Sequence, residues 1–402
     1  DLHRRRHSFP TRRSSDLNNI IGGTTAGARN LISGNSNSGV WIQDSTATGN
    51  QVKGNWIGVN AAGNAALANS VGVVLFNSTT GNTIGGTSAG AGNVISGNSV
   101  DGIQVFGLAT GNTIQGNFIG LNPGGTSAIA NTNQGIALFG GATNILIGGT
   151  TSSARNVISG NGNEGIRIQD SNTTGNTVEG NYIGTNAAGT AGVGNAVGIH
   201  VFNGSTANTL GGAAAGAGNL IAYNSGIGVS ITDSTTTGNV ILSNSFTSNG
   251  GLGIDLGADG VTVNDAGDTD SGPNNLTNFV DLLTATTTGT ELRLTGSASV
   301  AANTYYVVQI YSSPAGDPSG YGEGLTYLGS VNVPVGASGT VSGSYTLSGA
   351  IAAGSIITST ATRSDSSYTT YYETSEFSNQ VTALAPGVTV TPVSTTTTEA
   401  GG

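Results

Sequence analysis

The feature that most constrains this chain is an internal repeat of 63 residues. An Ile-Gly-Gly or Leu-Gly-Gly triplet begins at positions 21, 84, 147 and 210, and Ile-Ser-Gly-Asn follows in step at positions 32, 95 and 158. A fixed period of this size is typical of repeat architectures, in which each unit contacts only its neighbours. Several positions recur in phase, so we attribute the pattern to repeated structure rather than to chance.

Each repeat divides again into pieces of about 30 to 33 residues, which we take as single coils. Within residues 82–111, three short apolar runs are separated by Gly, Ser, Asn and Thr, a pattern typical of strands joined by turns. No stretch shows a sustained helical period with caps. The pattern predicts an all-β parallel solenoid of about seven to eight coils, because stacking is what buries the strands. We expect these residues to face its core: Val40, Ile42, Val73, Leu75, Ile103, Val105, Ile136, Leu138, Ile166, Ile168, Ile199, Val201, Val229 and Ile231.

Asparagine recurs at the corners between these strands. Asn tolerates left-handed backbone and bonds its own chain, and aligned Asn amides can bond along a stack. We therefore predict two Asn files, one of Asn35, Asn98, Asn161 and Asn224 and one of Asn55, Asn117, Asn181 and Asn244. An aromatic file, Trp56, Phe118, Tyr182 and Phe246, is interpreted as core or corner packing.

Two longer motifs carry a resemblance to a known family. Residues 82–98 read N-x-I-G-G-T-x-x-G-A-G-N-V-I-S-G-N, and residues 174–186 read T-G-N-x-x-x-G-N-aromatic-I-G-x-N. Both resemble the right-handed parallel β-helix repeats of secreted bacterial surface proteins, which have the pectate-lyase-like fold. The resemblance covers about residues 18–260 and implies that fold. It implies no single activity, because the fold carries lyases, hydrolases and non-catalytic adhesins.

Residues 1–17 differ in composition from the rest. They hold five of the 11 Lys and Arg residues and resemble translated sequencing-adapter sequence, so we treat them as a non-native leader; a basic targeting segment is the alternative. Without them the chain has 11 − 5 = 6 basic and 21 − 2 = 19 acidic residues, or about −13, which disfavours nucleic acid as a partner.

Composition also bears on where the protein works. The chain has no Cys, few charges and many Gly, Ser, Thr and Asn residues, which suits an exported protein without disulfides. No apolar run approaches the ~20 residues of a membrane span. We expect an extracellular or cell-surface location and a monomer within a longer multidomain chain, of which this is a fragment.

The pattern changes after residue 260. An Asp- and Asn-rich junction (261–278) is followed by a region (279–385) of seven expected strands, the last over residues 375–383, which favours a β-sandwich. The run at residues 312–329 resembles the Ig-like module that often follows such β-helices. The tail (386–402) is interpreted as a linker, and residues 395–402 resemble the start of a truncated Calx-β-type domain.

Candidate catalytic residues are few. Asp44, Asp170 and Asp233 share one repeat register, and a corner Asp that bonds backbone explains them. The acids and bases that break the register are Asp101, Glu164, Arg167 and His200, and these are the weak catalytic candidates. Asp101 and Glu164 should lie two coils, or roughly 10 Å, apart, near the limit for an inverting glycosidase. The family's polygalacturonase motifs are not met, which puts hydrolysis in doubt.

A binding face is the stronger expectation. If Ile and Val face inward, the alternate residues of one strand per coil face outward, and aromatic rings among amides suit sugars. The candidate ligand-binding residues are Trp41, Phe76, Gln104, Phe106, Phe139, Arg167, Gln169, His200 and Phe202. The alternative is that the four Phe rings are packing beneath a loop.

The junction is the candidate metal site. Its Gly-rich loop gathers oxygen ligands of the kind that calcium prefers, although the spacing is not that of an EF-hand. The candidate ligands are Asp255, Asp259, Asp265, Asp268 and Asp270, with Asx turns as the alternative interpretation.

Two functions from different classes follow. The first is a non-catalytic surface or adhesion-type protein that binds a polysaccharide or glycan surface along an exposed sheet, with calcium as the one possible cofactor. The second is a polysaccharide lyase or glycoside hydrolase of the same fold.

Overall fold

The computed structural model describes residues 17–387. The proposed leader, apart from Leu17, and the tail from residue 388 onward lie outside the described residues. No α-helix occurs within residues 17–387; two short 3-10 turns, η1 (Ala26–Ala28) and η2 (Pro273–Leu276), are the only helical elements of that range.

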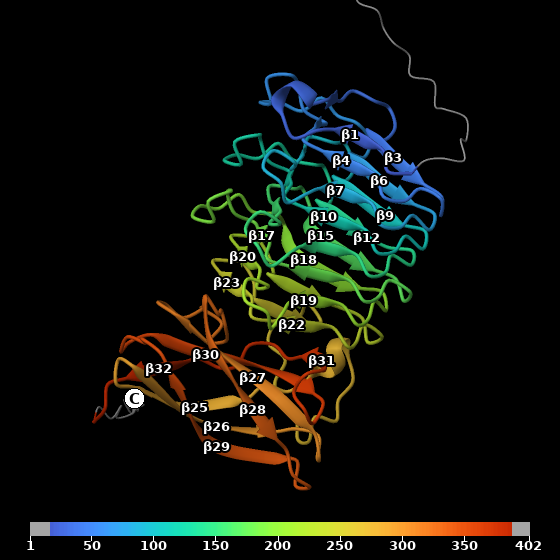
Figure 1. The fold of residues 1–402 in the computed structure, drawn as a ribbon. Helices are drawn as coiled ribbons and strands as arrows, with labels where there is room; N and C mark the ends of the chain where they lie inside the picture. The colour runs from blue at the N-terminus through green and yellow to red at the C-terminus, as the bar shows by residue number, and fades with distance from the viewer. Residues whose placement is uncertain (1–16, 388–402) are drawn as a thin grey trace, which may run out of the picture.

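Three parallel sheets of eight strands each wind around a common core (Figure 1). Sheet A consists of β1 (Ile20–Gly22), β4 (Gln51–Lys53), β7 (Thr83–Gly85), β10 (Thr113–Gln115), β13 (Leu146–Gly148), β16 (Thr177–Glu179), β19 (Thr209–Gly211) and β22 (Val240–Leu242). Sheet B consists of β2 (Leu31–Ile32), β5 (Trp56–Ile57), β8 (Val94–Ile95), β11 (Phe118–Ile119), β14 (Val157–Ile158), β17 (Tyr182–Ile183), β20 (Leu220–Ala222) and β23 (Ser245–Thr247). Sheet C consists of β3 (Val40–Gln43), β6 (Val73–Phe76), β9 (Ile103–Phe106), β12 (Ile136–Leu138), β15 (Glu164–Gln169), β18 (Val197–Phe202), β21 (Val229–Ile231) and β24 (Ile254–Leu256). Each strand pairs with the strand of the same sheet one coil away, so the predicted parallel β-helix is confirmed, with eight coils.

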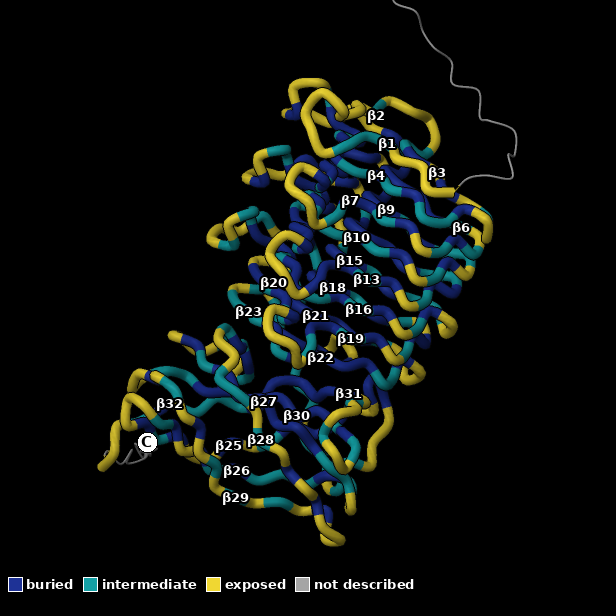
Figure 2. The backbone as a smooth tube through the Cα atoms, in the orientation of Figure 1, coloured by how far each residue is buried: buried dark blue, intermediate teal, exposed yellow. Residues whose placement is uncertain are grey.

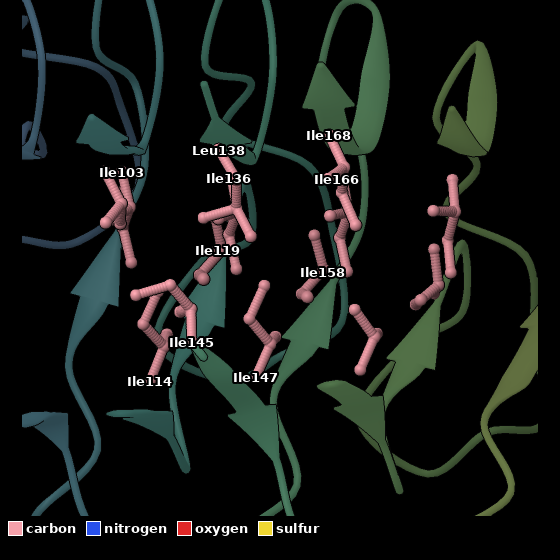
Figure 3. Packing of buried hydrophobic residues seen from close by; sticks show 14 of the residues in the cluster. Ile103, Ile114, Ile119, Ile136, Leu138, Ile145, Ile147, Ile158, Ile166 and Ile168 are labelled. Atoms are coloured by element: carbon pink, nitrogen blue, oxygen red, sulfur yellow. The ribbon is translucent and has the colours of Figure 1, made fainter. Parts of the chain in front are cut away.

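The core is a stack of aliphatic side chains, one layer per coil. All fourteen Ile, Val and Leu residues predicted to face inward are buried and belong to one continuous cluster. In Figure 3, Ile103, Ile136 and Ile166 lie side by side in successive layers of the stack. The walls of the solenoid are buried or half-buried, whereas its loops are exposed (Figure 2). Burial of this stack is the main stabilising contribution, because no single coil covers its own apolar face.

Asparagine ladders run along the corners, as predicted, and they are denser than predicted. Asn93 donates to Asn117 at 2.9 Å, and the pattern continues in every coil rather than in every second one. The first ladder is Asn30, Asn55, Asn93, Asn117, Asn156, Asn181, Asn219 and Asn244. The second is Asn35, Asn69, Asn98, Asn131, Asn161, Asn195, Asn224 and Asn249.

A third ladder precedes sheet A and is interrupted once. Asn50, Asn82 and Asn112 bond in sequence, as do Asn176, Asn208 and Asn239. Between them, Ile145 occupies the Asn position, is buried, and donates its backbone N–H to the Asn176 side chain. The backbone hydrogen bond is kept while the side chain joins the aliphatic core.

The corner aspartates Asp44, Asp170 and Asp233 all adopt left-handed backbone, with φ of 77°, 82° and 71°. Their side chains bond neighbouring coils: Asp170 Oδ2 accepts the Gly140 N–H, and Asp233 Oδ2 accepts the Asn203 N–H. The corner position of these residues is confirmed by the backbone, but the side chains of Asp170 and Asp233 bond a neighbouring coil, where a bond to the residue's own turn was expected.

The C-terminal unit is built from eight strands around a second core. They are β25 (Asp281–Thr287), β26 (Glu291–Ser299), β27 (Tyr305–Ser313), β28 (Thr326–Pro334), β29 (Thr340–Ser348), β30 (Ile356–Ser364), β31 (Tyr371–Thr374) and β32 (Val381–Leu384). Most pairs are antiparallel; β25 and β32 pair in parallel.

The last strand predicted for this unit, 375–383, is wrong for residues 375–380 and agrees with β32 from Val381 onward. Within it, Ser375 and Ser378 use their hydroxyls to accept backbone N–H groups of Ala361 and Ser359, which replaces regular strand pairing. Strand structure therefore stops after Thr374 and resumes at Val381.

This irregular segment, together with Thr374 and Gly324, seals the end of the β-helix. In β24, the Leu256 N–H bonds Glu376, and in β22 the Ile241 N–H bonds Thr374. In β23, the Phe246 N–H bonds the Gly324 carbonyl. Phe246 points into the core, because its register is shifted by one residue relative to the other aromatic residues of its motif. Its ring meets the ring of Phe377 edge-on, with the centroids 5.4 Å apart. All three sheet edges at this end are thereby capped, which protects strand edges that would otherwise be open.

Candidate functional site

The outward residues of sheet C, here called the outer face of sheet C, contain all nine candidate ligand-binding residues. Two files run along it. The first file consists of Trp41, Val74, Gln104, Ala137, Arg167 and His200. The second file consists, in coil order, of Gln43, Phe76, Phe106, Phe139, Gln169 and Phe202. The predicted inward and outward alternation therefore brings the candidates together on one wall.

The Phe rings of this face stack on one another. The ring centroids of Phe106 and Phe139 lie 4.6 Å apart with an interplanar angle of 7°, and Phe76 continues the stack at 4.6 Å from Phe106. Trp41 meets Phe76 edge-on at 6.0 Å and is 41% exposed. The three Phe rings are half-buried, and Phe106 lies between the other two. They form an aromatic ladder within the protein, with Trp41 at its exposed end.

A chain of hydrogen bonds crosses five coils beside this ladder. Asp101 accepts the Gln134 backbone N–H at 3.0 Å, and the Gln134 side chain donates to Glu164 at 2.7 Å. Glu164 lies 3.4 Å from His200 Nδ1, and His200 Nε2 lies 3.0 Å from the Thr232 hydroxyl. The sequence analysis did not identify Gln134 and Thr232 as site residues. Gln134 could have been found from its position two residues before an inward Ile, which Asp101 and Glu164 share.

The two acids of this chain differ in environment. Asp101 is 1% exposed, and its second oxygen accepts from Gln104 at 2.7 Å, so both oxygens are engaged. Glu164 is half-buried. Burial raises the pKa of Glu164, but hydrogen bonds from His200 and Gln134 outweigh it and bring the pKa to about 2. Glu164 is therefore ionised at neutral pH.

Arg167 is the charged residue of this face whose side chain has no partner within residues 17–387 and is therefore available to a ligand. Six Lys and Arg residues lie within residues 17–387, and the other five have partners. Arg29 lies over Trp56 and Arg155 over Tyr182, Lys53 bonds Gln51, Arg293 pairs with Glu291, and Arg363 pairs with Glu373. Arg167 makes no hydrogen bond or ion pair with any residue in this range, and its buried Nε has no acceptor there. Its guanidinium is the uncommitted cation of the described chain.

The acidic junction separates into two groups. Carboxylate oxygens of Asp265, Asp268 and Asp270 lie within 4.8 Å of one another, a grouping that could hold a metal ion. Burial and the charges of its neighbours raise the pKa of Asp268, whereas hydrogen bonds from Thr269 lower that of Asp265. The other two candidate ligands, Asp255 and Asp259, lie outside this group of three. Asp255 lies in β24, is buried, and has one oxygen without a partner within residues 17–387.

The comparisons with known proteins add no relative. A scan against protein-family models finds no match, and a search of curated proteins finds no similar sequence. Within the described residues, no helix is long and apolar enough to cross a membrane. The fold by itself defines the class: a parallel β-helix repeat protein whose last coil is sealed by a C-terminal β unit.

Proposed function

We propose that this chain is part of an extracellular, non-catalytic surface protein, of adhesion type, that binds carbohydrate on the outer face of sheet C. The observation that carries the proposal is Arg167, an outward guanidinium without an internal partner, placed between Ala137 and His200 on a half-exposed wall. Such a group binds hydroxyl or carboxylate oxygens of a ligand through charge-assisted hydrogen bonds.

The neighbours of Arg167 suit a sugar chain. His200 and Gln169 flank it on the adjacent strand and on its own strand, and Gln104 lies two coils away in the same file. A glycan lying along the solenoid axis, where coils are spaced about 4.8 Å apart, would meet Arg167 and His200 in successive coils and Gln104 beyond Ala137. Trp41 at the exposed end of the ladder offers a ring for sugar stacking. The stacked Phe rings support the strand wall rather than the ligand.

Two features favour binding over hydrolysis. A glycosidase acid must hold a proton at working pH, whereas the pKa of Glu164 is about 2. The other carboxylate, Asp101, is buried with both oxygens bonded.

A polysaccharide lyase is the second candidate. Glu164 and Thr232 hold the His200 ring, and His200 is the register partner of Arg167 on the adjacent strand. A base and a carboxylate-binding cation are what proton abstraction from an acidic sugar requires.

The finer fold assignments belong to the same proposal. We infer a right-handed β-helix of the pectate-lyase-like type, since parallel crossover connections are almost always right-handed. We also infer an Ig-like sandwich for the C-terminal unit. Calcium is proposed at Asp265, Asp268 and Asp270, whose clustered oxygens suit a hard cation.

A glycan array, screened with and without calcium, tests the binding proposal. The same glycans are then incubated with the protein and assayed for new reducing ends and for unsaturated uronates. The proposal expects retained glycans without either product. Product formation that is lost in Glu164→Ala or Arg167→Ala would establish the lyase or hydrolase instead.

A further inference from the structure

We infer a second saccharide-binding site in a groove on the outer side of sheet B, away from the outer face of sheet C. The groove has a volume of about 430 Å³ and is lined by Thr24, Thr25, Arg29, Trp56, Val94 and Phe118, among others. This inference goes beyond the proposed function, because it places a ligand on a different sheet.

The floor of the groove is an outward row of sheet B. Trp56, Val94 and Phe118 pair in successive coils, so the two rings lie two strand spacings, or about 10 Å, apart. Ile57, Ile95 and Ile119, the next residue of each strand, face the core. Both rings are half-buried and thus remain partly open to solvent.

One wall of the groove comes from loops that leave sheet B. Residues 59–66 and 121–128 are closed by the bridges Val59–Ala66 and Leu121–Ala128, and such loops project from the solenoid on the left of Figure 1. A Cβ at Gly63 or Gly125 would lie 3.1 Å from the ring of Trp56 or Phe118, respectively. Each loop therefore lies against the outer end of its ring.

What lies over the ring face differs between the repeats. Arg29 lies 4.4 Å above the Trp56 ring, and Arg155 lies 3.9 Å above the Tyr182 ring. In the repeat of Phe118, the equivalent position is Gly92, which has no side chain to cover the ring. Phe118 is therefore the ring of this row on which a ligand can stack.

Charge selects the ligand. Arg29 is exposed, and no Asp or Glu is among the residues that line the groove. A cationic ligand over Phe118 would be repelled by Arg29, whereas a sugar can place its apolar face on the ring and its oxygens near Arg29 and the Thr24 and Thr25 hydroxyls. A neutral sugar and an acidic sugar share this chemistry, and Arg29 favours the acidic one.

Tryptophan fluorescence tests the site, because the chain has two Trp residues, one on each face. Trp41→Phe leaves Trp56 as the reporter of the groove, and Trp56→Phe leaves Trp41 as the reporter of the outer face of sheet C. Each protein is titrated with cellohexaose and with a hexagalacturonate. We expect saturable changes in Trp56 emission, with tighter binding of the acidic sugar.

Variants in the Trp41→Phe background assign the signal. Phe118→Leu, which keeps apolar bulk, should weaken binding at least about fivefold, and Arg29→Ala should remove the preference for the acidic sugar. The control Tyr182→Phe, whose ring lies under Arg155 outside the groove, should leave binding unchanged, and far-UV circular dichroism checks folding.

An absence of any Trp56 response to both sugars overturns the inference, as does a response that a folded Phe118→Leu protein retains in full. A Trp41 response without a Trp56 response would sustain the proposed function and overturn this site alone. A Trp56 response without a Trp41 response would sustain this site, and the Arg167→Ala variant then decides the proposed function separately.

Discussion

The Glu376 carboxylate accepts a hydrogen bond from the backbone N–H of Leu256 at 2.8 Å, and this contact joins the C-terminal unit to the last strand of sheet C. Its other oxygen accepts the Thr262 N–H at 2.9 Å. The carboxylate is 3% exposed, so these bonds form in a region that excludes water. The C-terminal unit is thus an integral cap of the solenoid rather than a separate spacer.

This buried carboxylate predicts a pH dependence of stability. Burial, with a contribution from Asp255, raises the pKa of Glu376 from 4.5 to about 7. The folded state therefore holds a proton that the unfolded state releases, and stability falls as pH rises from about 4.5 through 7. The effect is on the order of 3 kcal/mol at most. Denaturant unfolding at pH 5 and pH 8 should show higher stability at pH 5.

Glu376→Gln should flatten this slope, since glutamine has no proton to release. Glu291→Gln, on β26 at the surface of the same unit, is the matched control and should leave the slope unchanged. A wild-type protein that is equally stable at pH 5 and pH 8 would contradict the assignment.

The Asn ladders should dominate local stability. Asn117 is buried, donates to the Ile84 carbonyl and to Asn156, and accepts from Asn93. Asn117→Ala leaves several buried polar groups unpaired and should lower the free energy of unfolding by about 3 kcal/mol. Asn172→Ala, at an exposed position, should change it by less than about 0.5 kcal/mol. Equal effects in chemical denaturation would argue against the ladder as a source of stability.

The aromatic ladder should stabilise the protein without contacting glycan. Phe106 stacks between Phe76 and Phe139, so Phe106→Ala should cost about 2 kcal/mol of stability. Its glycan affinity, measured well below the unfolding transition, should stay within about twofold of wild type. A large loss of affinity in the folded variant would show that the Phe edges take part in recognition.

Calcium should stabilise the junction if Asp265, Asp268 and Asp270 bind it. A site that binds the folded state alone adds about 2.7 kcal/mol when calcium exceeds its Kd by 100-fold, and this raises Tm. Asp268→Asn should remove the increase, whereas Asp259→Asn, outside the group of three, should retain it. Identical melting curves in calcium and in EDTA would leave these residues as turn-forming groups.

Much of the solenoid could be predicted because its rules are local. Alternation identified Ile103 and Ile166 as core residues, and the shared register placed Asp101 and Glu164 two coils apart. Gln134, which links them, was recognised only in the structure. The ladders were predicted at half their density, because the 63-residue period was followed rather than the single coil. The aromatic file grouped Phe246 with Trp56, Phe118 and Tyr182, but Ser245 occupies the register position of those rings, and Phe246 pairs with the inward Ile221.

The cap and the groove depend on contacts between distant residues. Glu376 and Leu256 are 120 positions apart, and no periodicity relates them. The shared register of Arg29 and Arg155 was visible in the sequence, but its meaning required the rings of Trp56 and Tyr182 beneath them. Stacking of the Phe rings on one another, rather than on a ligand, likewise depends on ring orientation.

The proposed function requires that Arg167 binds a glycan and that the protein does not cleave it. Isothermal titration calorimetry of the best ligand from the array, with wild type, Arg167→Ala and the control Arg293→Ala, tests this requirement most directly. We predict at least about a tenfold weaker Kd for Arg167→Ala, no change for Arg293→Ala, and no heat of product formation. Unchanged affinity in Arg167→Ala, or continuous heat from turnover that Glu164→Ala abolishes, would contradict it.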